Sequence, residues 1–433
     1  MRVPSWLPFI VAMTVCGPIL AGDEVPVLTE QSAVDQALAH HPLLQVMGAE
    51  AGMASSRTAM ARSEGRAQLS VNGFAGLSNM TSILPVPQVM PQAMLQSQDR
   101  PSIDLNATAM LPLATGGRIE QTIKAAELSA AAAEDSLTAT RVQVAYEARA
   151  AFADWRAALA MERVAEDALV AQQKQLVLAQ HLYDVGKTPK FDLLRSEASA
   201  ASSQQQLTNA KAEIATTIAA LAQAMGVPDV TLGVPAEEEP VSLPVDALAT
   251  GLASRPDLLA ARKQVTSAQA TVQARHASYK PQWYGMAMLD GLAPRSMDTS
   301  VGITVGVVAG LPLVDGGRRQ AEVREAEQGV TRAEGAVRVL ELQVRAEVLT
   351  AEAKAGAAKQ NIETASNQVP AAEEGYRVAQ IRYEAGKSIV VELLDALKAQ
   401  TEAQQSLVVA RAQYAKALAD VYRAMGVVVL RGK

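Results

Sequence analysis

Hydrophobic positions recur at alternating spacings of three and four residues along two stretches of the chain. In the first stretch they are Ile123, Ala126, Ala130, Ala133, Leu137, Thr140 and Val144. In the second they are Val323, Ala326, Val330, Ala333, Val337, Leu340 and Val344. This spacing is typical of helices that pack as coiled coils. Because residues 118–185 contain neither Gly nor Pro, we expect a rod of roughly 65 residues, about 100 Å long at 1.5 Å per residue.

Each long helix is followed, after a short break, by another stretch without Gly or Pro. These stretches are 190–225 and 387–425, and the breaks are 186–189 and 386–388. Helix on both sides of a short break predicts a long helical hairpin with a tight tip. Pro370 has no counterpart at Val170, and we expect it to interrupt the second rod.

Four other segments have a period of two, with one apolar face and one small or polar face. They are residues 68–77, 103–113, 283–290 and 300–311. Strands of about ten residues cross a bilayer when tilted, and apolar-out, polar-in alternation is the transmembrane barrel pattern. A half-buried sheet in a soluble protein would alternate in the same way. Four strands cannot close a barrel, so several chains would have to share one.

The chain contains an internal repeat. The segment LPLATGGR at 111–118 recurs as LPLVDGGR at 311–318, YDVGK at 183–187 as YEAGK at 383–387, and MGV at 225–227 as MGV at 425–427. These matches share one offset, so the chain is interpreted as two copies of one design. His41-Pro42 matches Arg255-Pro256 at a larger offset, so the first copy is longer between Pro42 and Leu111. Gly116-Gly117 is interpreted as a bend from strand into helix.

The N-terminal segment has the pattern of an export signal. Arg2 precedes a mostly apolar run, and Ala21 and Gly22 are small residues before an acidic pair. The alternatives are an amphipathic first helix and lipidation of Cys16. No apolar run of 18 residues follows residue 22, so any membrane crossing would be made by strands. The predicted organisation is 1–22 signal peptide, 23–227 first repeat, 228–244 linker and 245–433 second repeat.

The extra residues of the first copy fall between its two predicted strands, around residues 80–94. This segment contains Met80, Met90 and Met94 and is interpreted as an exposed loop. Thioether sulfur is a soft metal ligand, so a metal site is the alternative. Without a nearby Cys or His, an ordinary loop is the preferred interpretation.

Composition and charge narrow the functional classes. The 433 residues carry 39 basic and 45 acidic side chains without a basic stripe, which disfavours nucleic-acid binding. Aromatic residues are 3% of the chain, which favours close-packed helices over a thick core. One cysteine and four scattered histidines argue against a disulfide framework or a metal cluster. We therefore expect no catalysis, no cofactor and no metal.

The doubled order of strand pair, LPLxxGGR bend, long hairpin and YxxGK tip resembles the TolC-type outer-membrane efflux protein family, from about residue 30 to 427. The resemblance implies a mainly α fold with transmembrane β: a homotrimer whose 12-stranded β-barrel, with four strands per chain, continues into an α-helical coiled-coil tunnel. It also implies a passive duct, set in outer-membrane lipid, that works with a periplasmic adaptor protein and an inner-membrane transporter. The alternatives are a periplasmic coiled-coil adaptor or scaffold outside the membrane, and a small-solute diffusion porin.

The two tips are expected to form the adaptor-docking surface. Gly186 and Gly386 permit the sharp reversal, and Lys187 and Lys387 place a positive charge at each tip. A plain hairpin turn would account for the glycines but not for the paired lysines.

Glu392 and Asp395 are spaced three apart, so their carboxylates share one helix face. The resemblance implies that they form rings that constrict the entrance, and that Asp192 and Tyr383 help to tie neighbouring helices shut. Ser388 stands where the family often has a basic residue, so the closing link is expected to be weaker or to use Lys187 or Arg195. The alternative is that both carboxylates belong to an ordinary solvated face.

Overall fold

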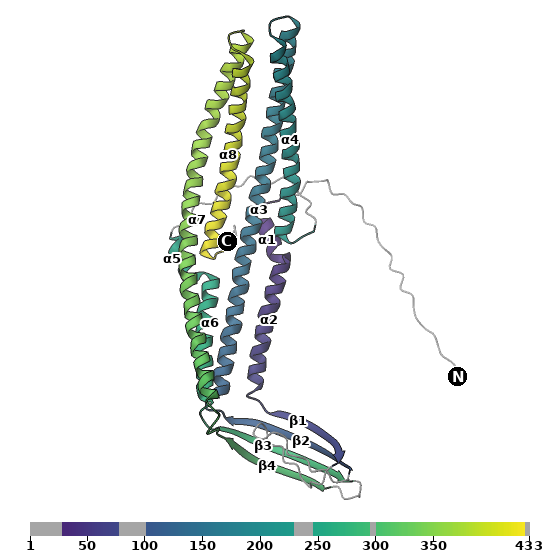
Figure 1. Cartoon of the computed structure of the whole chain (residues 1–433), viewed down its shortest axis with the longest axis vertical. Helices are drawn as coiled ribbons and strands as arrows, with labels where there is room; N and C mark the ends of the chain where they lie inside the picture. The colour runs from purple at the N-terminus through teal and green to yellow at the C-terminus, as the bar shows by residue number, and fades with distance from the viewer. Residues whose placement is uncertain (1–27, 78–100, 229–245, 295–299, 429–433) are drawn as a thin grey trace, which may run out of the picture.

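The computed structural model describes residues 28–77, 101–228, 246–294 and 300–428. Figure 1 shows an elongated molecule, with a small sheet at one end and the tips of two helical hairpins at the other. The predicted signal peptide, Cys16 and the methionines of the 80–94 loop lie outside the described residues.

Both halves of the chain have the same order of elements. The first half contains α1 (Glu30–His40), α2 (Pro42–Ser63), β1 (Gln68–Leu77), β2 (Pro101–Ala114), α3 (Arg118–Asp184) and α4 (Lys190–Met225). The second contains α5 (Ala247–Ser254), α6 (Pro256–Ala277), β3 (Gln282–Pro294), β4 (Ser300–Gly310), α7 (Arg318–Glu384) and α8 (Val390–Met425). Two helices, two strands and a long hairpin follow one another in each.

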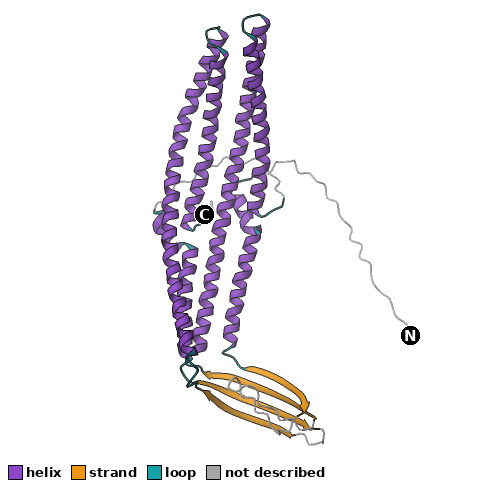
Figure 2. Ribbon diagram, viewed as in Figure 1, coloured by secondary structure: helices purple, strands orange, loops and turns teal. Residues whose placement is uncertain are grey.

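The predicted rods are confirmed, since α3 and α7 each have 67 residues and α4 and α8 each have 36 (Figure 2). The bend from strand into helix is also confirmed. Gly117 and Gly317 cap α3 and α7 with φ of 93° and 88°, a left-handed conformation that suits glycine.

The expected break at Pro370 is wrong. Helix α7 continues through this residue, although proline removes one backbone hydrogen bond and costs about 3 kcal/mol inside a helix. Contacts hold the helix on both sides of it: Ala365 is buried before the proline and Tyr383 after it. Gln404 of α8 also donates a hydrogen bond to Glu373 at 3.3 Å. Packing along α8 therefore outweighs the local defect.

The four strands form one antiparallel sheet in the order β1-β2-β3-β4. The two repeats meet at the β2–β3 pair, which leaves β1 and β4 at the edges. The predicted strands are confirmed, with β2 and β3 longer at their ends than the pattern indicated. Apolar side chains on the odd-numbered face are exposed, Ile303 at 75% and Val305 at 77%.

The core is thin and follows the helices. Helix α3 packs against α2 and α6 in the half next to the sheet and against α4 and α8 in the half next to the tips. Its Phe152 and Trp155 meet edge to face, with ring centroids 5.6 Å apart, in a cluster with Leu221 and Met225 of α4. None of the described helices is long and apolar enough to cross a membrane.

Candidate functional site: tips and equator

Both tips turn in the same way. At the first tip, the Lys187 amide donates to the Leu182 carbonyl, and the Gly186 amide donates to the Tyr183 carbonyl. At the second tip, the Lys387 amide donates to the Arg382 carbonyl, and the Gly386 amide donates to the Tyr383 carbonyl. This is the Schellman pattern that ends a helix with a left-handed residue. Gly186 and Gly386 have φ of 72° and 69°. A Cβ would meet nothing within 4 Å at either glycine, so backbone conformation and not crowding requires glycine there.

Lys187 and Lys387 are both exposed, one at each tip. Neither takes part in any of the described ion pairs. Hydrophobic side chains are exposed beside them, namely Val185 and Phe191 at the first tip and Ile389 at the second. Sequence reasoning missed this apolar component, which adjoins the paired positive charges.

Tyr383 lies in the seam between the two hairpins. Its side chain is 4% exposed, in a cluster with Val390 and Leu393 of α8, and Leu178 and Leu182 of α3 pack against this cluster. The hydroxyl has no hydrogen-bond partner among the described residues. Burial raises the pKa of Tyr383, and the negative charge of Asp192 on α4 raises it further. The structure thus brings the predicted pair Tyr383 and Asp192 into the same electrostatic environment without a hydrogen bond.

A second polar contact crosses the seam one to two turns further from the tip. Gln175 of α3 donates a hydrogen bond from Nε2 to the Tyr376 hydroxyl of α7 at 3.0 Å. The Gln175 Oε1 atom is buried and has no partner in the described part of the chain, and the same holds for Gln172 Oε1 and Gln400 Oε1. Near the tips, therefore, an apolar cluster and a polar contact both join the hairpins, and several buried polar atoms in this region have no partner among the described residues.

Glu392 and Asp395 are both exposed on the first turns of α8. Glu392 accepts a hydrogen bond from the Ser388 hydroxyl, and the Arg382 guanidinium of α7 lies 3.9 Å from its carboxylate. Within the chain, Arg382 is therefore the cation that pairs with Glu392, and the two residues lie on either side of the second tip. Sequence reasoning missed this partner, although Arg382 precedes the tip by one turn. No contact of Lys187 or Arg195 with Glu392 is found among the described residues.

The ends of α4 and α8 form a level that we call the equator. Here the MGV and X-Pro repeat motifs meet: a Cβ on Gly226 would lie 2.6 Å from the His41 Cα, and one on Gly426 would lie 2.7 Å from the Pro256 Cδ. Both glycines are also left-handed, with φ of 71° and 73°. Crowding and backbone conformation together require glycine at these two positions.

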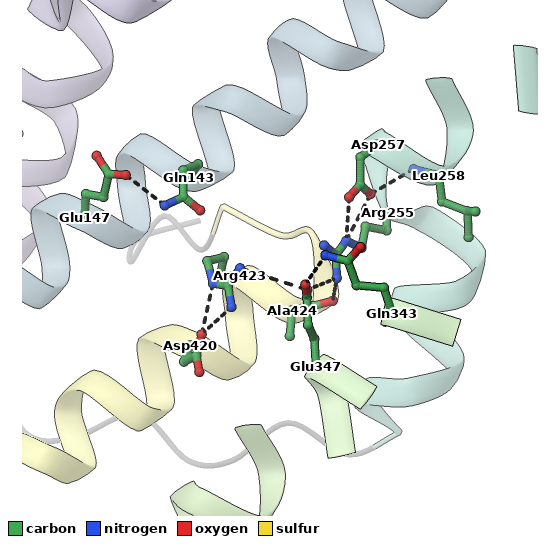
Figure 3. A network of polar contacts seen from close by, with 10 residues as sticks. All are labelled: Gln143, Glu147, Arg255, Asp257, Leu258, Gln343, Glu347, Asp420, Arg423 and Ala424. Atoms are coloured by element: carbon green, nitrogen blue, oxygen red, sulfur yellow. Dashed lines mark hydrogen bonds and ion pairs between the residues drawn. The ribbon is translucent and has the colours of Figure 1, made fainter. Parts of the chain in front are cut away.

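Arg255 is the centre of a polar network at the equator of the second repeat (Figure 3). Its side chain is 10% exposed and binds Glu347 of α7 at 2.6 Å and Asp257 of α6 at 2.9 Å. It also donates to the Ala424 carbonyl near the end of α8 at 3.3 Å. Arg423 extends the network to Asp420 at 2.7 Å. Three helices, α6, α7 and α8, are thereby joined by one guanidinium.

The electrostatics of the network favour its charged form. Burial acts to raise the pKa of Glu347, but hydrogen bonds from Gln343 and Arg255 and the charges of Arg255 and Arg423 outweigh it, so that this pKa is lowered. Burial likewise opposes the charge of Arg255, yet Glu347 and Asp257 raise its pKa overall. In the first repeat Gln143 binds Glu147 in the same way at 2.8 Å, but His41 occupies the place of Arg255.

The described residues contain no group of three or more His, Cys, Asp or Glu side chains able to hold a metal ion.

Comparison with known proteins places this geometry in a family. The family model described as "Outer membrane efflux protein" matches residues 33–227 and 248–427. The outer membrane efflux protein BepC of Brucella suis is 25% identical over 297 residues, which are 66% of this chain and 65% of BepC, slightly less than two thirds of its length.

Solved channel structures share the fold. The outer-membrane channel OprN superimposes with a TM-score of 0.80 at 21% identity, covering 92% of this chain and 89% of OprN. VceC of Vibrio cholerae has a TM-score of 0.77 at 22% identity, with 92% and 96% of the two chains covered. MtrE of Neisseria gonorrhoeae, solved in its open state, has a TM-score of 0.74 at 20% identity, with 92% and 88% covered.

Proposed function

The chain belongs to the outer membrane efflux protein family, and from this premise we propose that it forms a passive exit duct through the outer membrane, for efflux or secretion. The observation that carries the proposal is a four-stranded sheet with an exposed apolar face, directly continuous with two hairpins of long helices. In a periplasmic adaptor or scaffold outside the membrane, this apolar face would be left in contact with water.

We propose that the duct is a homotrimer. Strands β1 and β4 each have a neighbour on one side only, and open sheet edges are not tolerated in hydrocarbon. Three chains would join β4 of one to β1 of the next and close an even-stranded barrel. Leu69, Val71, Ile303 and Val305 would then contact outer-membrane lipid.

Fractionation, mass and conductance test this function together. The protein should sediment with the outer membrane, have about three times the chain mass after correction for detergent, and conduct ions in planar bilayers. A protein recovered only from the soluble periplasm would favour the scaffold, and a conducting monomer would refute the trimer.

We propose that the tips dock a periplasmic adaptor, which couples the duct to an inner-membrane transporter. The exposed Lys187 and Lys387 and the apolar side chains beside them support this. The double variant Lys187→Glu/Lys387→Glu reverses both charges without altering the glycines. It should abolish efflux-dependent growth while trimers remain in the outer membrane. The matched control, Lys174→Glu, changes an exposed lysine of α3 away from the tip; equal effects of the two variants would refute docking at the tips.

We propose that Glu392 and Asp395 line the closed entrance. Three copies of each would form carboxylate rings, which attract cations and bind divalent ions. Glu392→Ala/Asp395→Ala should remove the cation preference and the block by divalent ions. The control Glu363→Ala changes an exposed carboxylate of α7 remote from the tip. Unchanged selectivity in the double variant would mean that both belong to an ordinary solvated face.

A further inference from the structure

The two faces of the sheet differ in chemistry. On the odd-numbered face, β1 to β4 present Leu, Val, Ile and Ala side chains. The even-numbered face of β1 and β2 presents Ser70, Asn72, Asn106 and Thr108, and the Asn72 amide donates to Asn106 at 3.2 Å. If the apolar face contacts lipid, the even-numbered face lines the duct.

Three methionines interrupt this polar face. Met110 on β2 lies directly opposite Met286 on β3, and Met288 follows Met286 on the same face, opposite Thr108. Directly opposed Cβ atoms lie about 4.5–5.5 Å apart and diagonal ones about 7–8 Å, within reach of long side chains. Methionine has three rotatable side-chain bonds, so these thioethers can converge on one point.

Met288 has different surroundings from two buried methionines of the helical region. Met225 and Met425 fill apolar clusters of the helical region. Met288 is 2% exposed, yet it is absent from every hydrophobic cluster of the described residues. The Thr108 hydroxyl opposite it is buried and has no hydrogen-bond partner in the described part of the chain. The site is therefore a group of thioethers in polar surroundings.

We propose that Met110, Met286 and Met288 bind a soft monovalent cation, Cu(I) or Ag(I), inside the duct. Thioethers select such cations and are poor ligands for Mg²⁺, which prefers oxygen. No proton is released on binding, because a thioether carries none. The inference rests on the proposed function for the side of the sheet that faces the duct.

Ag(I), which needs no reductant, is the probe for a test on the full-length purified trimer in nitrate buffer. Calorimetry should detect one Ag(I) per chain in the wild type and none at this affinity in Met110→Leu/Met286→Leu/Met288→Leu. Leucine conserves volume but cannot bind the ion. The control Met53→Leu/Met60→Leu changes two exposed methionines of α2 and should bind as the wild type does. Mg²⁺ should not compete.

Bilayer recordings separate failure of the site from failure of the proposed function. Ag(I) should reduce the wild-type conductance and leave that of the triple variant unchanged. A wild-type protein that conducts but neither binds nor responds to Ag(I) overturns the site alone, whereas one that does not conduct overturns the duct. Retained binding in the triple variant, or its loss in Met80→Leu/Met90→Leu/Met94→Leu, would place the ligands elsewhere and also overturn the inference. If the triple variant fails to form trimers, Met286→Leu alone should weaken binding, and unaltered binding in it would refute the site.

Discussion

The equator and the tips hold the same helices together by opposite means. At the equator, Arg255 uses its guanidinium on two carboxylates and one backbone carbonyl. At the tips, Tyr383 is equally well buried but its hydroxyl has no described partner. Buried polar groups that are fully paired rigidify a structure, whereas unpaired ones cost free energy in the assembled state. We therefore expect the equator to stay fixed and the seam at the tips to separate at a lower cost in free energy.

The largest effect is expected from Arg255→Ala. Removing Arg255 leaves Glu347, whose side chain is 21% exposed, without its nearest counter-charge. Breaking a fully buried pair costs about 3–5 kcal/mol, which is the upper bound for this one. Thermal unfolding of the detergent-solubilised protein should show a markedly lower Tm. The control Arg377→Ala breaks an exposed pair with Glu374 on α7 and should change Tm little. Equal Tm values for the two variants would contradict the role of the equator as the fixed end.

Gly426→Ala is expected to have the next largest effect. The new Cβ would lie 2.7 Å from Pro256 and 2.9 Å from the Arg255 Cα, and the left-handed backbone alone costs about 1–3 kcal/mol. Gly335→Ala is the matched control, because nothing lies within 4 Å of its Cβ inside α7. Gly335→Ala should raise the free energy of unfolding by about 0.5–1 kcal/mol, because glycine is less favourable than alanine inside a helix. If Gly426→Ala and Gly335→Ala both shift Tm in the same direction, glycine is not specifically required at position 426.

The distance along the chain explains which of these features the sequence could predict. The coiled-coil spacing, the period-two strands and the glycines at the tips are local patterns, and all are found in the structure at or near the expected residues. The network at Arg255 joins residues from α6, α7 and α8 that no spacing rule connects. One signal was available: the Arg255-Pro256 and MGV motifs repeat together, and the structure shows that they touch.

Local rules also explain the errors. Pro370 was expected to break a helix because propensity counts only the lost hydrogen bond and the steric clash. Contacts of α7 with α8 on both sides of the proline outweigh that cost, in the cluster of Ala358 and Tyr414 before it and in that of Tyr383 and Val390 after it. Local rules also gave no indication of the ion pair between Arg382 and Glu392, which the hairpin brings together on the two sides of the second tip.

Acid should weaken the equator selectively. The pKa of Glu347 is lower in the folded protein than its ordinary value of 4.5. Its charge therefore contributes stability above pH 4.5, and this contribution is lost as the pH falls through the lower folded value. The Tm difference between wild type and Glu347→Gln should be large at neutral pH and shrink in acid. A difference independent of pH would show that the Glu347 charge is not what stabilises the equator.

Alkali should open the tips. This is the smallest of the expected effects in free energy, but it tests the difference between the equator and the tips most directly. Burial, aided by the charge of Asp192, holds the pKa of Tyr383 above its ordinary 10.0. The neutral seam is therefore at full stability below pH 10.0 and loses it as the pH rises through the raised value, because a tyrosinate would be buried near a carboxylate. Conductance in planar bilayers should rise in this range for the wild type.

Tyr383→Phe removes both the titrating group and the unpaired hydroxyl. It should therefore leave the free energy of unfolding unchanged or raise it by up to about 1 kcal/mol. It should also abolish the alkaline rise in conductance. Tyr183 is the repeat counterpart on the first tip and is exposed, at 38%. Tyr183→Phe should therefore keep the wild-type response, which controls for lysines that titrate in the same range. If both variants still open in alkali, the seam at Tyr383 is not the part of the wall that yields first.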